Sequence, residues 1–294
     1  MSGNADSLPG AARQSLVLAG DALAFAFGFF VRNSGVILRR LAAPGLLGCA
    51  ALYVLLWGYC TQLTDFIGFP SEGLAGRVLG IAAAAILVML LLHAIVVARV
   101  GELLAGRRDM APAFLGIGTN AWRIYVADLR MVLAFGAYEV VALFAVNSLT
   151  RFGAPPVVPF LLSVASWLVL VWLLARGWFF LVPVSLDAQS EGILVMSWRR
   201  SEGLLLPILL VLLVLVGVTL FLLGGGELLL RAVGILSPVP ARLSFTGAIG
   251  IYERNLWAFV LLVSLAYLVG TSLMTAARIK LYRDAAEWRR HESR

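Results

Sequence analysis

Six long apolar stretches constrain the fold of this chain more than any other feature of its sequence. They cover residues 41–59, 78–98, 131–149, 157–175, 204–223 and 256–277. A helix rises 1.5 Å per residue, so each stretch is long enough to cross about 30 Å of hydrocarbon. Backbone polar groups in lipid must be satisfied within the segment, which a helix achieves. We therefore predict an all-α integral membrane protein with six transmembrane helices.

The distribution of charge predicts the orientation of these helices. Charged residues make up 13% of the chain, against roughly 25% in soluble domains. Most of the 23 Lys and Arg residues fall in the N-terminal arm, the second and fourth loops and the C-terminal tail. By the positive-inside rule these segments are cytoplasmic, so both termini lie inside. The net charge of +7 is spread over loops and forms no basic patch of the kind that binds nucleic acid.

The segments outside the six spans are too short for a second domain. We expect a single membrane domain over residues 1–294. Residues 1–14 are expected to form a disordered tail, and 278–294 a basic cytoplasmic tail that meets anionic lipid head groups. In the second span, Gly80 and Ala84 lie four residues apart, a small-residue spacing that predicts close helix packing.

Residues 15–33 are apolar but contain Asp21. We expect them to form a helix in the cytoplasmic interface, with Phe25, Phe29 and Phe30 at the acyl boundary, leading directly into the first span. A spanning placement of residues 15–31 is the alternative. A secretory signal peptide would need a more basic start and a cleaner apolar core.

Amphipathic stretches also precede the third and fifth spans, at 110–130 and 191–203. We interpret the chain as three units, each an amphipathic interfacial helix on the cytoplasmic side followed by a hairpin of two spans. Internal repeats of this kind are common in membrane proteins. The alternative is that any three hairpins entered from basic loops look alike.

The residues that most enzymes need are scarce in this chain. Residues 116–121 imitate a dinucleotide fingerprint, but no strand precedes them. Two histidines, His93 and His291, offer little for metal binding or imidazole catalysis. Cys49 and Cys60 lie too far apart on one helix to bridge. We therefore predict no enzyme activity, no cofactor and no metal site.

Three ionisable residues lie in or at the edge of apolar spans, where a charge is costly and usually has a partner or a function. Helical rise places Glu139 about 13 Å and His93 about 9 Å from the cytoplasmic end of their spans. Arg176 follows the fourth span. One hypothesis is that these residues form a buried polar cluster that binds a lipid head group or relays protons. The alternative is that Glu139 packs helices together and Arg176 snorkels to phosphates.

The sequence around the fifth span resembles a known family. Residues 181–184 read Leu-Val-Pro-Val, and residues 197–203 read Ser-Trp-Arg-Arg-Ser-Glu-Gly. The pattern resembles the membrane-domain family of glycerophosphoryl diester phosphodiesterases and related six-helix bacterial proteins, where a proline-containing helix end precedes a Ser-Trp-x-x-(Ser/Thr)-x-Gly helix. The closing residues 281–283 look similar as well. This resemblance implies a helical module of the bacterial inner membrane; the family's catalytic domain is a separate soluble barrel, so no catalytic residue carries over.

We therefore expect a non-catalytic membrane module that engages lipids or a partner protein. In this interpretation Trp198 lies in the interface, and Arg199 and Arg200 contact lipid phosphates. The alternative is a small transporter or lipid-translocating protein whose site is the cluster of Glu139, His93 and Arg176. An aqueous cavity that reaches Glu139 would distinguish the two.

Overall fold

The computed structural model describes residues 7–68, 72–106, 118–185, 193–236 and 255–292, and these residues form helices joined by short turns. The helices are α1 (Ser7–Gly68), α2 (Glu72–Leu104), α3 (Thr119–Arg151), α4 (Val157–Arg176), α5 (Leu181–Ser185), α6 (Ile193–Arg200), α7 (Leu205–Ala232) and α9 (Leu256–Glu292). Six of them, α1 to α4, α7 and α9, are long and apolar enough to cross a membrane. Each predicted span falls on one of these six. The predicted all-α class with six membrane-length helices is therefore confirmed.

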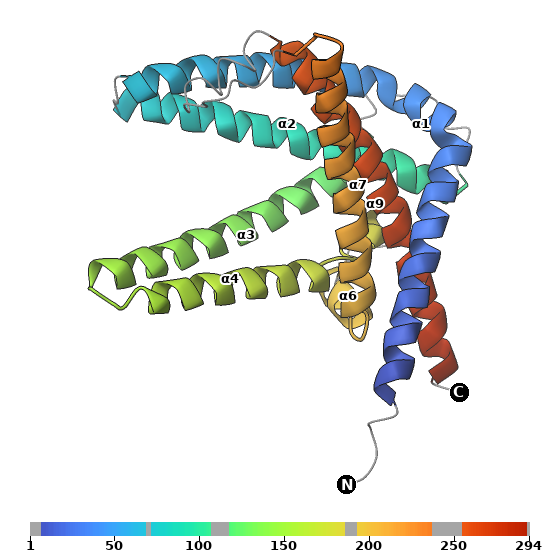
Figure 1. Ribbon diagram of the computed structural model, residues 1–294. Helices are drawn as coiled ribbons and strands as arrows, with labels where there is room; N and C mark the ends of the chain where they lie inside the picture. Colours follow the sequence, from blue (N-terminus) through green and yellow to red (C-terminus); the bar gives the residue numbers. More distant parts are fainter. Residues whose placement is uncertain (1–6, 69–71, 107–117, 186–192, 237–254, 293–294) are drawn as a thin grey trace.

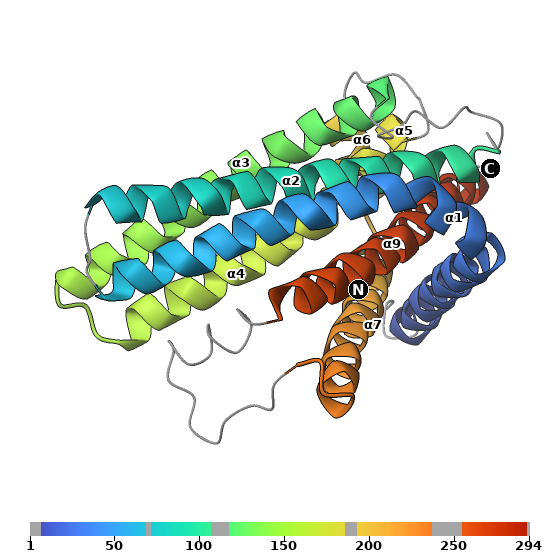
Figure 2. The same ribbon diagram turned by 90° about the horizontal axis from the view of Figure 1, so that it is seen from above.

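The long helices form two groups that cross one another (Figure 1). The first part of α1 runs beside α7 and α9, and the rest of α1 lies alongside α2, as Figure 2 shows from above. The helices α3 and α4 pack on each other, and α3 also packs on α2. Adjacent long helices therefore contact each other, and α1 belongs to both groups.

Each group has its own hydrophobic core. Small residues of α1 are fully or almost fully buried in the first core, which lets the helix backbones approach closely; these are Ala19, Ala22 and Ala26, clustered with Ile208 and Leu215 of α7 and with Ala276 and Ala277 of α9. The second core joins α1, α2 and α3 to the residues that follow α4; it includes Leu41, Ala94 to Ala98, Val100, Ile124 and Phe180. Phe179 belongs to the first core and Phe180 to the second, so the residues after α4 fasten the two groups together.

Helix α1 differs from the predicted N-terminal region at its start. It begins at Ser7, so residues 7–14, which we expected in a disordered tail, are helical. Residues 15–33 continue without a break into the first predicted span. The helix changes direction along its length (Figure 1), and it contains Pro44, a residue that removes one backbone hydrogen bond and bends helices.

The prediction of close helix packing at Gly80 is wrong. Among the described residues, a Cβ atom built on Gly80 meets nothing within 4 Å, so none of the described helices packs closely against it. Close approaches occur instead at Gly270 of α9, where a Cβ would lie 2.5 Å from Oγ1 of Thr219 on α7, and at Gly48 of α1, where it would overlap the side chain of Leu92. Four-residue spacing alone therefore did not identify the packed faces.

Helices α3 and α4 expose large apolar side chains over most of their length. Leu133 is 63% exposed, Phe144 74% and Trp167 62%. Apolar surface of this extent is unfavourable in water and expected against lipid. The predicted amphipathic stretches are described in part: residues 118–130 form the start of α3 and residues 193–200 form α6, while 107–117 and 186–192 lie outside the described residues.

Candidate functional site

A buried carboxylate and an imidazole join α2 to α3. Nδ1 of His93 lies 2.6 Å from Oδ2 of Asp128, whose side chain is 8% exposed. A buried carboxylate is costly unless it is paired and hydrogen-bonded, and a proton on Nδ1 provides that bond. The pairing leaves Nε2 as the ring nitrogen that can take a second partner. From α9, the ring of Tyr267 meets the His93 ring edge-on at a centroid distance of 6.5 Å.

A second polar pair lies across from the first. The guanidinium of Arg278, on α9, stacks over the indole of Trp178 at 4.7 Å from the ring centroid. Within the described residues, Nε of Arg278 and Nε1 of Trp178 are buried and have no hydrogen-bond partner. A buried donor left unpaired costs about 1–3 kcal/mol, and more when it is charged. Such atoms call for an acceptor that the described residues do not supply.

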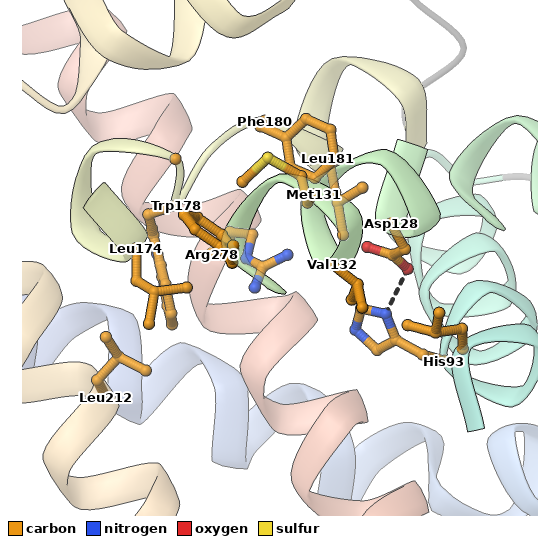
Figure 3. Close-up of a pocket in the computed structure, with 13 residues that line it drawn as sticks. His93, Asp128, Met131, Val132, Leu174, Trp178, Phe180, Leu181, Leu212 and Arg278 are labelled. Atoms are coloured by element: carbon orange, nitrogen blue, oxygen red, sulfur yellow. Dashed lines mark hydrogen bonds and ion pairs between the residues drawn. The ribbon is translucent and has the colours of Figure 1, made fainter. Parts of the chain in front are cut away.

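Both pairs line one pocket of about 320 Å³ between α2, α3, α4, α7 and α9. This volume lies at the lower end of the range for small-molecule sites. Figure 3 shows the Arg278 guanidinium between Trp178 and the His93–Asp128 pair. The rest of the wall is apolar apart from Gly177, and comprises Leu90, Met131, Val132, Phe135, Leu174, Phe180, Leu181 and Leu212. We call this space the Arg278 pocket.

The structure gives the three residues of the predicted polar cluster different surroundings. His93 lines the Arg278 pocket, whereas Glu139 and Arg176 are not part of its lining. Oε1 of Glu139 is buried without a hydrogen-bond partner in the described part of the chain. The guanidinium of Arg176 stacks on Trp172 and Trp198, at 5.7 and 5.4 Å from their ring centroids. The two residues that instead join His93 are Asp128 and Arg278.

Sequence reasoning assigned Asp128 and Arg278 to other roles. Asp128 was placed in an amphipathic stretch before the third span, and Arg278 in the basic tail after the sixth. In the structure α3 begins at Thr119 and α9 continues to Glu292, without a break at either predicted span end. The usable signal is an acid or a base close to the end of an apolar helix.

The segment with the family resemblance fastens α6 to the end of α4. The hydroxyl groups of Ser197 and Ser201 donate to the carbonyl oxygen of Arg176, at 3.0 and 3.2 Å. The last carbonyls of a helix lack partners within the helix, so these side chains satisfy one of them. Trp198 packs edge-on against Trp172 at 5.0 Å, and Nη1 of Arg176 donates to the carbonyl of Trp198 at 3.4 Å. These five residues form what we call the α4–α6 junction.

Two further residues of the same segment serve the fold. The guanidinium of Arg200 stacks over Tyr282 of α9 at 4.1 Å, which ties α6 to that helix. Gly203 has a φ of +76° in the turn between α6 and α7, a conformation that other residues adopt at a cost. Of the predicted lipid contacts, Trp198 is 42% exposed and Arg199 is exposed. Both are accessible to a lipid surface.

Metal ligands and disulfides add nothing to this site. In the part of the chain that the structure describes, His, Cys, Asp and Glu side chains do not gather in groups of three or more that could hold a metal ion. Cys49 and Cys60 are not joined by a disulfide.

No known protein family, curated protein or solved structure shows significant similarity to this chain. The resemblance to the phosphodiesterase membrane-domain family therefore stays a prediction. Function has to be inferred from the geometry of the pocket.

Proposed function

We propose that this protein is a non-catalytic, multi-pass membrane module that binds a membrane lipid in the Arg278 pocket. One observation carries the proposal: Arg278 and Trp178, each with a buried N–H that has no partner among the described residues, belong to the lining of a pocket whose wall is otherwise mostly apolar. A lipid offers oxygen acceptors at one end and an apolar chain at the other. A polar, water-soluble metabolite would offer no apolar surface to most of that wall.

The position of the pocket along the helices agrees with a lipid. Arg278 is the first residue after the predicted span 256–277, so its guanidinium lies close to the level of head groups. His93 and Leu212 lie deeper in the helices α2 and α7. A lipid that enters with its head group at Arg278 therefore has its chain in the hydrocarbon layer.

The proposal includes a topology in the bacterial inner membrane. Both termini are cytoplasmic, and the spans form three hairpins preceded by cytoplasmic amphipathic helices, with Trp198, Arg199 and Arg200 at the inner head groups. Arg199→Cys in a background without Cys49 and Cys60 tests it. A membrane-impermeant maleimide is expected to label this cysteine in inverted vesicles and not in intact spheroplasts. Labelling in spheroplasts would show that the orientation is wrong.

Filling the pocket tests the lipid site. Leu212→Trp places a large side chain in the Arg278 pocket, whereas Leu213→Trp makes the same change on a neighbour that is 72% exposed and outside the pocket lining. Native mass spectrometry of protein released from native lipid discs is expected to show about one lipid fewer on Leu212→Trp, and no loss on Leu213→Trp. Equal retention by both variants and the wild type would mean that the pocket holds no lipid.

A second candidate is a small transporter or lipid-translocating protein. The observation that favours it is the His93–Asp128 pair in the same pocket, because an imidazole next to a buried carboxylate is a usual proton-binding arrangement in transporters. A lipid-scrambling assay in proteoliposomes separates the two functions. Translocation above that of empty liposomes, abolished by Asp128→Asn, would favour this candidate over a binding module.

A further inference from the structure

The Arg278 pocket is lined by one carboxylate and one guanidinium, and among the described residues the carboxylate has a hydrogen-bonded partner whereas Nε of the guanidinium has none. Asp128, the carboxylate of the lining, already accepts from His93 at 2.6 Å and is 8% exposed on its side chain. Arg278 has an aromatic partner in Trp178, but its Nε has no acceptor among the described residues. A cationic head group would have to compete with His93 for Asp128. An anionic one would meet an arginine that lacks a hydrogen-bonded acceptor.

The second unpaired donor strengthens this asymmetry. Trp178 is 6% exposed, and its Nε1 is a donor that cannot accept a hydrogen bond. The indole N–H belongs to the ring on which the Arg278 guanidinium stacks, at 4.7 Å from the ring centroid. One group with several acceptor oxygens can therefore satisfy both donors. Phosphate and carboxylate have this chemistry, and arginine binds both by charge-assisted hydrogen bonds.

We propose that the Arg278 pocket is selective for an anionic amphiphile, whose phosphate or carboxylate lies at Arg278 and Trp178 and whose chain follows the apolar wall towards Leu90 and Leu212. This inference rests on the proposed lipid site and names the class of lipid that the site takes. The His93–Asp128 pair belongs to the same lining, and the hydrogen bond from His93 occupies Oδ2 of Asp128. A zwitterionic lipid also offers a phosphate, but it brings a cation into a pocket whose carboxylate is already bonded to His93. An uncharged lipid offers Arg278 no anion.

The test measures retention of defined lipids by the full chain in an uncharged detergent, with native mass spectrometry. The probes are phosphatidylglycerol, oleate, phosphatidylcholine and sodium phosphate. The wild type is expected to retain the first two about tenfold or more better than phosphatidylcholine, since hydrogen bonds to charged groups are the strong ones. Sodium phosphate is expected not to displace the two anionic lipids. Displacement at equal concentration would mean that the site binds free phosphate, and would overturn the proposal that its ligand is an amphiphile.

Three variants assign the selectivity to the pocket. Arg278→Met removes the charge and its donors and is expected to abolish the preference, while Arg283→Met makes the same change on an exposed arginine of the same helix and is expected to preserve it. Trp178→Phe keeps a ring for Arg278 and removes the N–H, so affinity for both anions is expected to fall severalfold. Wild-type preference in Arg278→Met would overturn the inference. If that result came with lipid loss in Leu212→Trp, the proposed lipid site itself would still stand.

Discussion

Arg176 and Arg278 both stack on tryptophan, and their surroundings differ. In the α4–α6 junction, Arg176 lies against Trp172 and Trp198 and donates to a backbone carbonyl, while two serines bond to its own carbonyl oxygen. In the Arg278 pocket, Arg278 lies on Trp178, and the Nε atom of the guanidinium and the indole N–H are both buried without acceptors among the described residues. The polar groups of the junction are hydrogen-bonded within the chain. Two N–H groups of the pocket residues have no acceptor among the described residues.

The contrast separates stability from binding. Polar groups that are paired within the chain stabilise the fold, whereas buried donors without partners lower its stability and persist where they have another use. Substitutions in the junction should therefore lower stability without changing lipid retention. Substitutions in the pocket should change lipid retention with little loss of stability.

The largest expected difference comes from one substitution made in each region. Gly203→Ala places a side chain at φ +76° beside the junction and is expected to lower the free energy of unfolding by about 1–3 kcal/mol. Gly177→Ala, in the pocket lining, keeps an ordinary helical φ of −77°, and its Cβ would lie 3.0 Å from the flexible end of Met131 and 3.3 Å from the backbone oxygen of Leu173. It is expected to cost less, because it forces no residue with a side chain into a positive φ. Unfolding by sodium dodecyl sulfate in mixed micelles measures both; equal losses would contradict the contrast.

The next difference compares the two arginines directly. Arg176→Met removes two ring contacts, each about 0.5–1 kcal/mol at exposed sites, and is expected to destabilise the protein by about 1–2 kcal/mol without changing lipid retention. Arg278→Met also removes a ring contact, with Trp178, but it relieves a buried charge whose Nε has no acceptor among the described residues. In lipid-free micelles its loss of stability is therefore expected to be smaller than that of Arg176→Met. The same unfolding titration, run with and without bound lipid, checks both variants. A large loss from Arg278→Met without lipid would assign this arginine to the fold.

The sequence was sufficient to predict the helices, because an apolar run longer than the hydrocarbon thickness has few other stable forms. All six predicted spans fall on membrane-length helices. Pairings across helices were not predictable in the same way. His93 and Asp128 are 35 positions apart, and their contact depends on how α2 and α3 pack, which hydropathy does not encode.

The motif that carried the family resemblance is explained residue by residue. Ser197 and Ser201 bond to the end of α4, Trp198 packs on Trp172, and Gly203 occupies the turn. From sequence we assigned Trp198 to the interface and Arg200 to lipid phosphates. The structure adds protein contacts for both: Trp198 packs on Trp172, and Arg200 stacks over Tyr282. These contacts form because the serines of α6 bond to the end of α4 and so hold α6 against the protein.

The smallest expected effect isolates a single hydrogen bond in each region. Ser197→Ala removes a donor that bonds to the carbonyl of Arg176 at 3.0 Å, and such bonds average about 0.6 kcal/mol in membrane proteins, with a maximum near 1.7. Trp178→Phe removes a donor that has no partner in the described residues, so without lipid it should cost nothing beyond the change in ring size. Ser163→Ala, whose hydroxyl bonds within α4, is the control for serine removal. If Trp178→Phe destabilised the lipid-free protein more than Ser197→Ala, the indole N–H would have an acceptor within the protein, and the pocket would lose one of the two donors that define its ligand.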